Sequence, residues 1–319
     1  MGYPSGAHKY RYQNSNMEES PLVTIGLTCF NNEKTIERAL KSAINQDWEN
    51  KEIILIDDCS TDNSTTILSK LNSQHPQVQI INNSKNCGLA YNENVIVKKA
   101  KGEFVVFFDG DDESRTDRIT KQYERFLEYK TIHPDSEIFV YSNRNVVPIN
   151  NIKKKFTRFA IGRRSPEPYG KIVADYILNV KKKSNKFCWG MFGSCTIFTK
   201  TSYIKNLNGF DEDFKRCAEL DFAIRGAMKG YHFISVNESL MTQYLTLGGH
   251  KTLKKDLLFR KKLIKKHKKY LCQNLLYTSS LLNTYAWYWY TKKVIFIGHF
   301  FRLFARCFSL MNKFRSLTL

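Results

Sequence analysis

Apolar and polar positions follow two alternating patterns along the first third of the chain. Short apolar runs bounded by polar turn residues are typical of strands that are buried on both faces. Between these runs, apolar residues recur every three or four positions, as on the buried face of a helix. The patterns predict strands over residues 22–30, 52–56, 78–81 and 104–108, and helices over 33–45, 64–72 and 92–100. This alternation favours an α/β fold with a mostly parallel, doubly wound sheet flanked by helices.

The pattern is less regular after residue 108. It predicts a polar helix over 113–130, strands over 138–141 and 195–198, and a helix over 219–229. Residues 145–186 are basic, contain prolines and lack a clear period, so we expect a long loop or a lid there.

Three acids stand within four residues directly after the last of the early strands, in the sequence Asp109-Gly110-Asp111-Asp112. Carboxylates this close raise one another's pKa unless a cation neutralises them. A hard divalent ion shared with a substrate's phosphates is the usual solution in proteins. Taken alone, the tetrapeptide is equally consistent with a solvated turn.

The positions of other polar residues favour a functional site. Thr28, Asp57-Asp58 and the acids of residues 109–112 all fall at the carboxyl ends of predicted strands. Ligands bind at this edge of open α/β sheets. A purely structural protein has no reason to gather acids on one edge.

Charge divides the chain into two parts. The sequence has 319 residues with a formal net charge of +20, and 16 lysines and arginines but only one acid lie in residues 251–319. A composition of 42% hydrophobic and 25% charged residues is that of a globular protein. Residues 1–20 are polar and lack the apolar core of a secretion signal, and the eight cysteines form no CxxC pair. We therefore expect reduced thiols, a cytoplasmic location and no zinc site.

Three ordered blocks of the sequence carry a family resemblance. They are PLVTIGLTCFNNEKTIERALKSAINQDWENKEIILIDDCSTDNST at 21–65, NCGLAYNENVIVKKAKGEFVVFFDGDDE at 86–113 and GFDEDFKRCAELDFAIRGAMKG at 209–230. Together they resemble family 2 glycosyltransferases, inverting enzymes that use nucleotide-sugar donors. The resemblance implies the GT-A fold, a Rossmann-like and mostly parallel sheet flanked by helices. Composition indicates a flexible leader at 1–20 and a basic, aromatic-rich helical tail at 251–319, and the resemblance implies a catalytic domain between them at 21–250.

Roles for the strand-end residues follow from the resemblance. It implies nucleotide binding by Thr28, Asp57, Asp58, Asp109 and Asp111. Asp58 would accept a hydrogen bond from uracil N3–H, which makes a UDP-sugar the expected donor. Asp111 and Asp112 would lie nearest a Mg²⁺ or Mn²⁺ cofactor.

The third block holds the candidate catalytic base. An inverting transfer needs a carboxylate that accepts the proton of the acceptor hydroxyl. The family motif is Glu-Asp followed two residues later by Asp, whereas this chain reads Ala218-Glu219-Leu220-Asp221. Glu219 is the first candidate and Asp221 the second, and Arg225 could pair with Asp221 along a helix. Glu219 could also be an ordinary first-turn acid that favours the helix dipole.

Two further residues are candidates for acceptor binding. Trp189, near Phe187 and Phe192, could stack on a sugar or could pack in the core. His250 follows Gly248-Gly249 and could reach the diphosphate or simply be exposed.

The tail allows two interpretations. No long uncharged apolar run is present, but aromatics with interspersed Lys and Arg suit a helix at the membrane interface. A location at the inner face of the cell membrane, beside a glycan or lipid-linked glycan acceptor, would follow. Alternatively, the tail packs on the catalytic domain or forms an oligomer contact.

Two other functions fit parts of the sequence. A basic tail with aromatics could bind nucleic acid, although the acidic edge would repel it and no such motif is present, so we expect no nucleic-acid partner. A non-catalytic nucleotide-sugar-binding relative would be consistent with Ala218. The synthesis of a cell-surface polysaccharide or O-antigen by a metal-dependent enzyme is the interpretation favoured by the resemblance.

Overall fold

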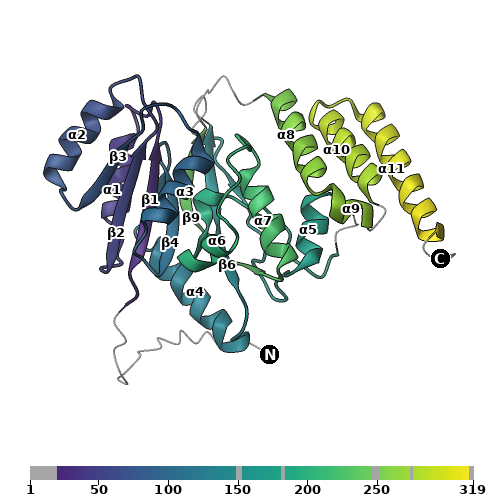
Figure 1. Cartoon of the computed structure of the whole chain (residues 1–319), viewed down its shortest axis with the longest axis horizontal. Coiled ribbons are helices and arrows are strands. Elements are labelled where there is room, and N and C mark those ends of the chain that lie inside the picture. Colours follow the sequence, from purple (N-terminus) through teal and green to yellow (C-terminus); the bar gives the residue numbers. More distant parts are fainter. Residues whose placement is uncertain (1–19, 149–152, 181–183, 246–251, 274–275, 316–319) are drawn as a thin grey trace.

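The computed structural model describes residues 20–148, 153–180, 184–245, 252–273 and 276–315 (Figure 1). Within these ranges the strands form one mixed sheet of nine strands, in the order β3-β2-β1-β4-β8-β6-β9-β5, with β7 paired to β6. Four helices follow one another in the tail, beside the half of the molecule that contains α7 (Figure 1).

The first half of the sheet is parallel. Its strands are β1 (Val23–Cys29), β2 (Lys51–Asp57), β3 (Val78–Asn82) and β4 (Phe104–Asp109). The helices that connect them are α1 (Ile36–Ile44), α2 (Ser64–Gln74) and α3 (Leu89–Lys99). Each predicted strand and helix of this half is therefore present, with its ends displaced by a few residues.

The second half of the sheet departs from the parallel pattern. Its strands are β5 (Glu113–Ser114), β6 (Ile138–Pro148), β7 (Phe156–Arg158), β8 (Phe198–Lys200) and β9 (His232–Leu245). β8 runs antiparallel between β4 and β6, whereas β9 runs parallel to β6. The remaining helices of this half are α4 (Arg118–Ile132), α5 (Lys171–Ile177), α6 (Thr201–Asn206), α7 (Ala218–Met228) and the 3₁₀ turn η1 (Ser194–Thr196).

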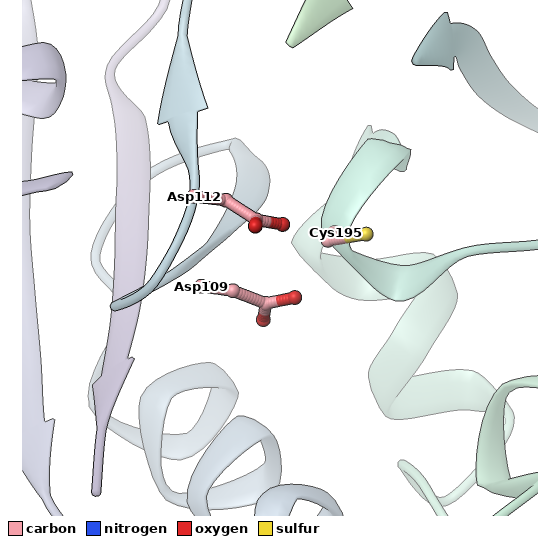
Figure 2. Close-up of side chains that lie close together, drawn as sticks. All are labelled: Asp109, Asp112 and Cys195. Carbon is pink, nitrogen blue, oxygen red and sulfur yellow. The ribbon is translucent and has the colours of Figure 1, made fainter. Parts of the chain in front are cut away.

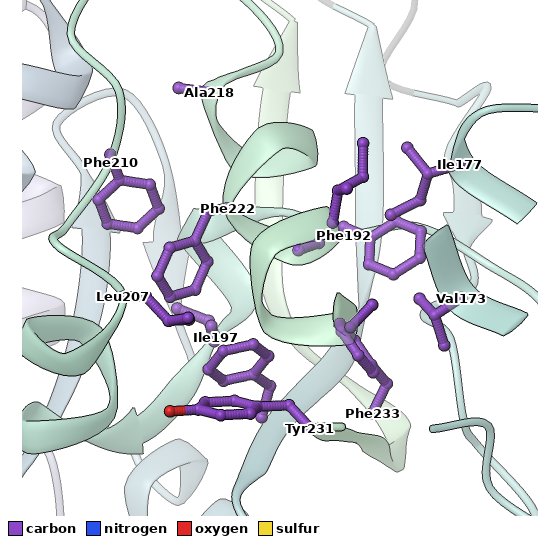
Figure 3. Packing of buried hydrophobic residues seen from close by; sticks show 14 of the residues in the cluster. Val173, Ile177, Phe192, Ile197, Leu207, Phe210, Ala218, Phe222, Tyr231 and Phe233 are labelled. Atoms are coloured by element: carbon purple, nitrogen blue, oxygen red, sulfur yellow. The ribbon is translucent and has the colours of Figure 1, made fainter. Parts of the chain in front are cut away.

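Two apolar cores lie on opposite faces of the sheet. Successive strand residues alternate between them, because side chains of a strand point to opposite faces. In β2, for example, Ile54 and Ile56 join one core and Ile53 and Leu55 the other. In the first of these cores Phe222 of α7 packs among Phe210, Ile197 and Tyr231 (Figure 3). This packing positions the first turn of α7 at the edge of the sheet.

The tail packs against this same core. It consists of α8 (Leu253–Lys266), α9 (Lys268–Gln273), α10 (Tyr277–Thr291) and α11 (Ile295–Arg315). Leu263, Ile264 and Leu271 are buried in the cluster that also contains Phe222. Of the two interpretations of the tail, packing on the rest of the chain is therefore realised for α8 and α9. The predicted boundary at residue 250 lies outside the described residues.

Three details differ from the predicted elements. Helix α4 begins at Arg118 rather than 113, because Glu113 and Ser114 pair with β9. The strand predicted from residue 195 begins at 198, after the turn η1. The segment 145–186, predicted as a loop, contributes the end of β6, β7 and α5 within its described residues.

Candidate active site

The sheet brings the predicted strand-end residues to one edge. In the strand register Cys29 lies opposite Asp57, and Thr28 lies opposite Asp109. Gly110 turns the chain at this point, with its N–H donating to the Thr28 carbonyl at 2.9 Å. A Cβ on Gly110 would lie 2.7 Å from that carbonyl oxygen, so only glycine fits. The predicted strand-end residues therefore lie together at one edge of the sheet.

Asp57 and Asp58 are both buried and hold the loops around them. Asp57 accepts hydrogen bonds from the Ser60 hydroxyl at 2.5 Å and the Thr65 hydroxyl at 3.3 Å. Asp58 Oδ1 accepts from Asn83 Nδ2 and from the Cys87 N–H, each at 2.8 Å. Among the described residues, its Oδ2 accepts only from the Gly88 N–H, at 2.8 Å. Because each carboxylate oxygen has two lone pairs, Oδ2 of Asp58 can accept one more hydrogen bond.

Two acids after β4 point toward a single position. Figure 2 shows the side chains of Asp109 and Asp112 extending toward Cys195 of η1. One ligand atom from each of the three residues lies within 4.8 Å of the others. Burial and the neighbouring carboxylates raise the pKa of Asp109 to about 6 and that of Asp112 to about 9. Paired acids with raised pKa values are the arrangement that a bound cation relieves.

The donor set fits a hard divalent ion. Asp112 Oδ2 is buried and has no hydrogen-bond partner in the part of the chain that the structure describes. Carboxylate oxygens suit Mg²⁺ or Mn²⁺, which take further ligands from phosphate and water. Burial raises the pKa of the Cys195 thiol, and its sulfur lies 3.1 Å from Arg144 Nη1. The protonated thiol is therefore a neighbour of the two acids rather than a natural ligand for such an ion.

Asp111 lies outside this three-residue group. Its carbonyl oxygen accepts a hydrogen bond from Arg38 Nη2 at 2.9 Å. It is close enough to raise the pKa of both Asp109 and Asp112. The structure thus places Asp112 with Asp109 in the group that could hold a metal ion, whereas the resemblance implied that Asp112 and Asp111 would lie nearest the ion.

Glu219 stands in the first turn of α7 and lines a cavity of about 690 Å³ together with Asp109. Burial raises the pKa of its carboxyl group, while the cationic Arg260, Arg144 and Arg216 oppose the shift. A carboxylate with a raised pKa is a stronger base than an exposed one, as general-base catalysis near neutral pH requires.

Asp221 occupies a different environment, although it is only two residues away. Its side chain is fully buried, and Oδ2 accepts from Arg225 Nε at 2.8 Å. Oδ1 lies 2.8 Å from Lys266 Nζ and 2.9 Å from His267 Nε2, both of which belong to the tail. Burial opposes ionisation, but these hydrogen bonds outweigh it and hold the pKa well below its usual range. A carboxylate held by two cationic side chains and a histidine is a weak base, so the geometry argues against the second candidate.

The two predicted acceptor residues have different outcomes. Trp189 is stacked on Tyr176 with ring centroids 4.4 Å apart, and its indole N–H donates to the Ser184 carbonyl at 2.8 Å. Tyr176 lines the cavity and Trp189 does not. Trp189 is therefore partly buried against a residue that lines the cavity, and its role in acceptor binding stays a prediction. His250 lies outside the described residues.

Other charged residues at the site were not predicted. Glu93 of α3 is buried near Asp109 and Glu219, and burial raises its pKa well above the usual value. Arg144 of β6 and Arg260 of α8 both line the cavity. An acid in the middle of an otherwise apolar helix face was the one available signal for Glu93. The sequence contains no signal that would place Arg144 and Arg260 at the site, because the strand and the tail helix that carry them come together only in the folded chain.

Comparisons with known proteins agree with this geometry. The model of the family described as "Glycosyl transferase family 2" matches residues 24–187, about half of the chain. The chain belongs to this family.

Individual relatives match in part. The chain is 27% identical over 252 residues to a hyaluronan synthase of Pasteurella multocida, covering 73% of this chain and 24% of the relative. It is 34% identical over 122 residues to the Escherichia coli enzyme UDP-Glc:alpha-D-GlcNAc-diphosphoundecaprenol beta-1,3-glucosyltransferase WfaP, covering 38% of this chain and 45% of the relative. The chain thus spans less than half the length of both relatives.

Solved structures confirm the fold. The crystal structure of S. aureus TarS 1–349 in complex with UDP-GlcNAc has a TM-score of 0.56 and 16% identity, covering 91% of this chain and 88% of that one. The predicted GT-A fold with a helical C-terminal region is confirmed.

Proposed function

We propose that this family 2 glycosyltransferase moves a sugar from a nucleotide-sugar donor to a hydroxyl of a glycan or lipid-linked glycan, with inversion at the anomeric carbon. The observation that carries the proposal is that Asp109, from the donor edge, and Glu219 line the same cavity. A base and a phosphate-binding edge must face one space for a direct displacement.

A UDP-sugar is the donor that the site supports best. Thr28, Asp57 and Asp58 would surround the base, and Asp58 Oδ2 keeps the acceptor position that uracil N3–H requires. TarS was crystallised in complex with UDP-GlcNAc, and the E. coli relative is named as an enzyme that uses UDP-Glc. That relative's name also places its acceptor on diphosphoundecaprenol, which supports a lipid-linked acceptor here.

Asp109 and Asp112 would hold Mg²⁺ or Mn²⁺ together with the donor diphosphate, and Asp111 would complete the contacts to the ribose and phosphates. A divalent ion supplies Lewis-acid stabilisation of the charge on the departing nucleoside diphosphate.

Glu219 would act as the base. Its carboxylate accepts the proton of the acceptor hydroxyl while that oxygen forms a bond to the anomeric carbon. The bond from the anomeric carbon to the diphosphate oxygen breaks on the opposite face, and its electron pair leaves with the nucleoside diphosphate. Asp221 takes no part in proton transfer and instead secures α7 to α8.

The test is binding and hydrolysis of a panel of nucleotide sugars with Mn²⁺, comparing wild type with Asp112→Asn. We expect one UDP-sugar to bind tightly and to be hydrolysed slowly, with both activities lost in the variant. The absence of binding by every nucleotide sugar in the presence of Mn²⁺ would overturn the proposal. Binding without turnover on any acceptor would favour the non-catalytic relative.

A second proposal concerns α11, which we place on an anionic membrane surface. Within the described ranges, no helix has the length and apolar character needed to cross a bilayer. One side of α11 nevertheless exposes large apolar side chains at helical spacing, namely Phe296, Phe300, Leu303, Phe304, Phe308 and Met311. Arg302 and Arg306 are exposed on the same helix, and the tail carries 16 basic residues against one acid. Apolar area flanked by cations suits an interfacial helix on anionic lipid, at the inner face of the cell membrane.

Vesicle sedimentation tests this placement. We expect the protein to bind phosphatidylglycerol vesicles but not phosphatidylcholine vesicles, and Phe296→Ser/Phe300→Ser to lose that binding. Equal binding of the double variant would contradict the proposal. A wild-type dimer that the double variant dissociates, measured by light scattering, would assign α11 to self-association instead.

A further inference from the structure

The cavity that contains Glu219 has a wall built by the tail. Its lining includes Asp109 and Glu219 together with Arg260 of α8 and Trp287 of α10. The residues assigned to the nucleotide base, Thr28 and Asp58, do not line it. The tail side of the cavity therefore lies away from the donor base, where an acceptor would enter.

Two arginines face each other across strands at this cavity. Arg144 of β6 and Arg158 of β7 are register partners in an antiparallel pair. Their guanidinium groups both contact the sulfur of Met191, at 3.7 Å and 3.8 Å. Like charges placed directly opposite in a sheet are destabilising. Burial lowers the pKa of Arg158, and repulsion by the positive charge of Arg144 lowers it further.

Arg260 adds a third cation from the tail. Its guanidinium lies 4.3 Å from the centre of the Trp287 ring, and its Nε is buried without a hydrogen-bond partner. Among the described residues, no carboxylate forms an ion pair with Arg144, Arg158 or Arg260. Arg158 is exposed and Arg144 and Arg260 are partly buried, so an anion that enters the cavity could reach all three guanidinium groups.

The acids of the cavity offset the charge of these arginines only in part. Asp256 forms an ion pair with Arg216, which also lines the cavity. Burial raises the pKa of Glu219 and of Asp109, Arg260 and Arg144 oppose the shift of Glu219, and Arg144 opposes that of Asp109, but among the described residues none of these pairs forms an ion pair. Lys215 adds a further exposed cation to the lining. The described lining therefore carries an excess of positive charge, with five cationic side chains against three acids.

We infer that Arg144, Arg158 and Arg260 form a subsite for an acidic group of the acceptor, a phosphate or a carboxylate on the sugar that offers its hydroxyl to Glu219. The inference rests on the proposed glycosyl transfer and specifies its acceptor as an anionic glycan. Guanidinium groups bind both kinds of anion with paired hydrogen bonds. The Trp287 ring beside Arg260 gives the same subsite an apolar surface for a sugar face.

The experiment measures binding of three sugars that share one ring. Wild-type protein is saturated with UDP and Mn²⁺, so that the donor phosphate positions are filled, and is titrated with glucose, glucose 6-phosphate and glucuronate. We expect one or both acidic sugars to bind at least tenfold more tightly than glucose. The stronger of the two identifies phosphate or carboxylate as the natural group.

Variants assign the effect to the arginines. Arg158→Gln and Arg260→Gln should each weaken binding of the preferred acidic sugar by about tenfold, because each removes one charge-assisted interaction. Arg164→Gln and Lys261→Gln are matched controls, since neither residue lines the cavity, and should bind like wild type. Circular dichroism verifies the fold of each variant, and Arg158→Lys should retain part of the binding.

Two outcomes overturn the subsite. One is equal binding of all three sugars by wild type. The other is a loss of UDP affinity in Arg158→Gln and Arg260→Gln with unchanged sugar binding, which would assign the arginines to the donor diphosphate. If UDP itself does not bind, the proposed function fails, and the same titrations without UDP still decide whether the arginines select acidic sugars.

Discussion

The buried carboxylate of Asp221 allows a sharp prediction, because its substitution separates anchoring from catalysis. Asp221→Asn removes one negative charge that is fully buried and is shared by Arg225, Lys266 and His267. Removing one partner of a buried ion pair costs about 3–5 kcal/mol. The side chains of Arg225, Lys266 and His267 are 23%, 33% and 11% exposed, so they recover part of their hydration. Arg225 also keeps its bond to the Gly209 carbonyl at 2.6 Å, and we therefore expect the lower end, about 3 kcal/mol.

Urea unfolding followed by tryptophan fluorescence measures this loss of free energy of unfolding. Asp213→Asn is the matched control, because its side chain is 83% exposed and lies 3.8 Å from Lys262. It should change stability by less than about 0.5 kcal/mol. Since the pKa of Asp221 is depressed, its contribution is complete above the ordinary value of 3.8 and is lost only as pH falls below it. A variant within about 1 kcal/mol of wild type that has lost transfer would refute the anchoring role and restore Asp221 as the base.

Three further predictions concern the site and its surroundings. Glu219→Gln should keep donor affinity in calorimetry but lower the transfer rate by about 10²–10⁴-fold, and a rate near wild type would exclude it as the base. Asp112→Asn should lose Mn²⁺-dependent UDP binding, and chelation by EDTA should reproduce that loss in wild type; unchanged binding would place the ion elsewhere. Burial, His133 and Lys130 lower the pKa of His232 from 6.5 to about 4, so stability is complete above pH 6.5 and falls toward pH 4. The half-exposed ring limits this loss to about 1–2 kcal/mol, and urea unfolding of His232→Gln at pH 7 and pH 5 should show a smaller difference than wild type.

The first half of the fold could be predicted because its strands are buried on both faces. Continuous apolar runs such as Phe104–Phe108 are then visible in the sequence, and the acids after them mark the carboxyl edge. β9 escaped prediction because its exposed and buried positions do not alternate regularly: Val236 is followed by Asn237, Glu238 and Ser239, where the register with β6 shifts. Local patterns cannot reveal such irregular pairing.

The site was predicted where one segment carries it and was missed where two segments meet. Asp109 and Asp112 are three residues apart, so their proximity follows from local sequence. The partnership of Asp221 with Lys266 and His267 joins residues more than 40 positions apart, through packing of α7 against α8. The Arg144 and Arg158 pair likewise depends on the register of β6 and β7, which the basic composition of that segment did not reveal.

The packing of α8 has a consequence for engineering. Leu263 and Ile264 fill the core beneath α7, Lys266 and His267 hold its Asp221, and Arg260 lines the cavity. A chimera that joins residues 1–250 to the tail of a different relative would therefore exchange part of the core and part of the cavity at once. Productive exchange of acceptor preference between such proteins requires α7 and α8 to be transplanted together as one module.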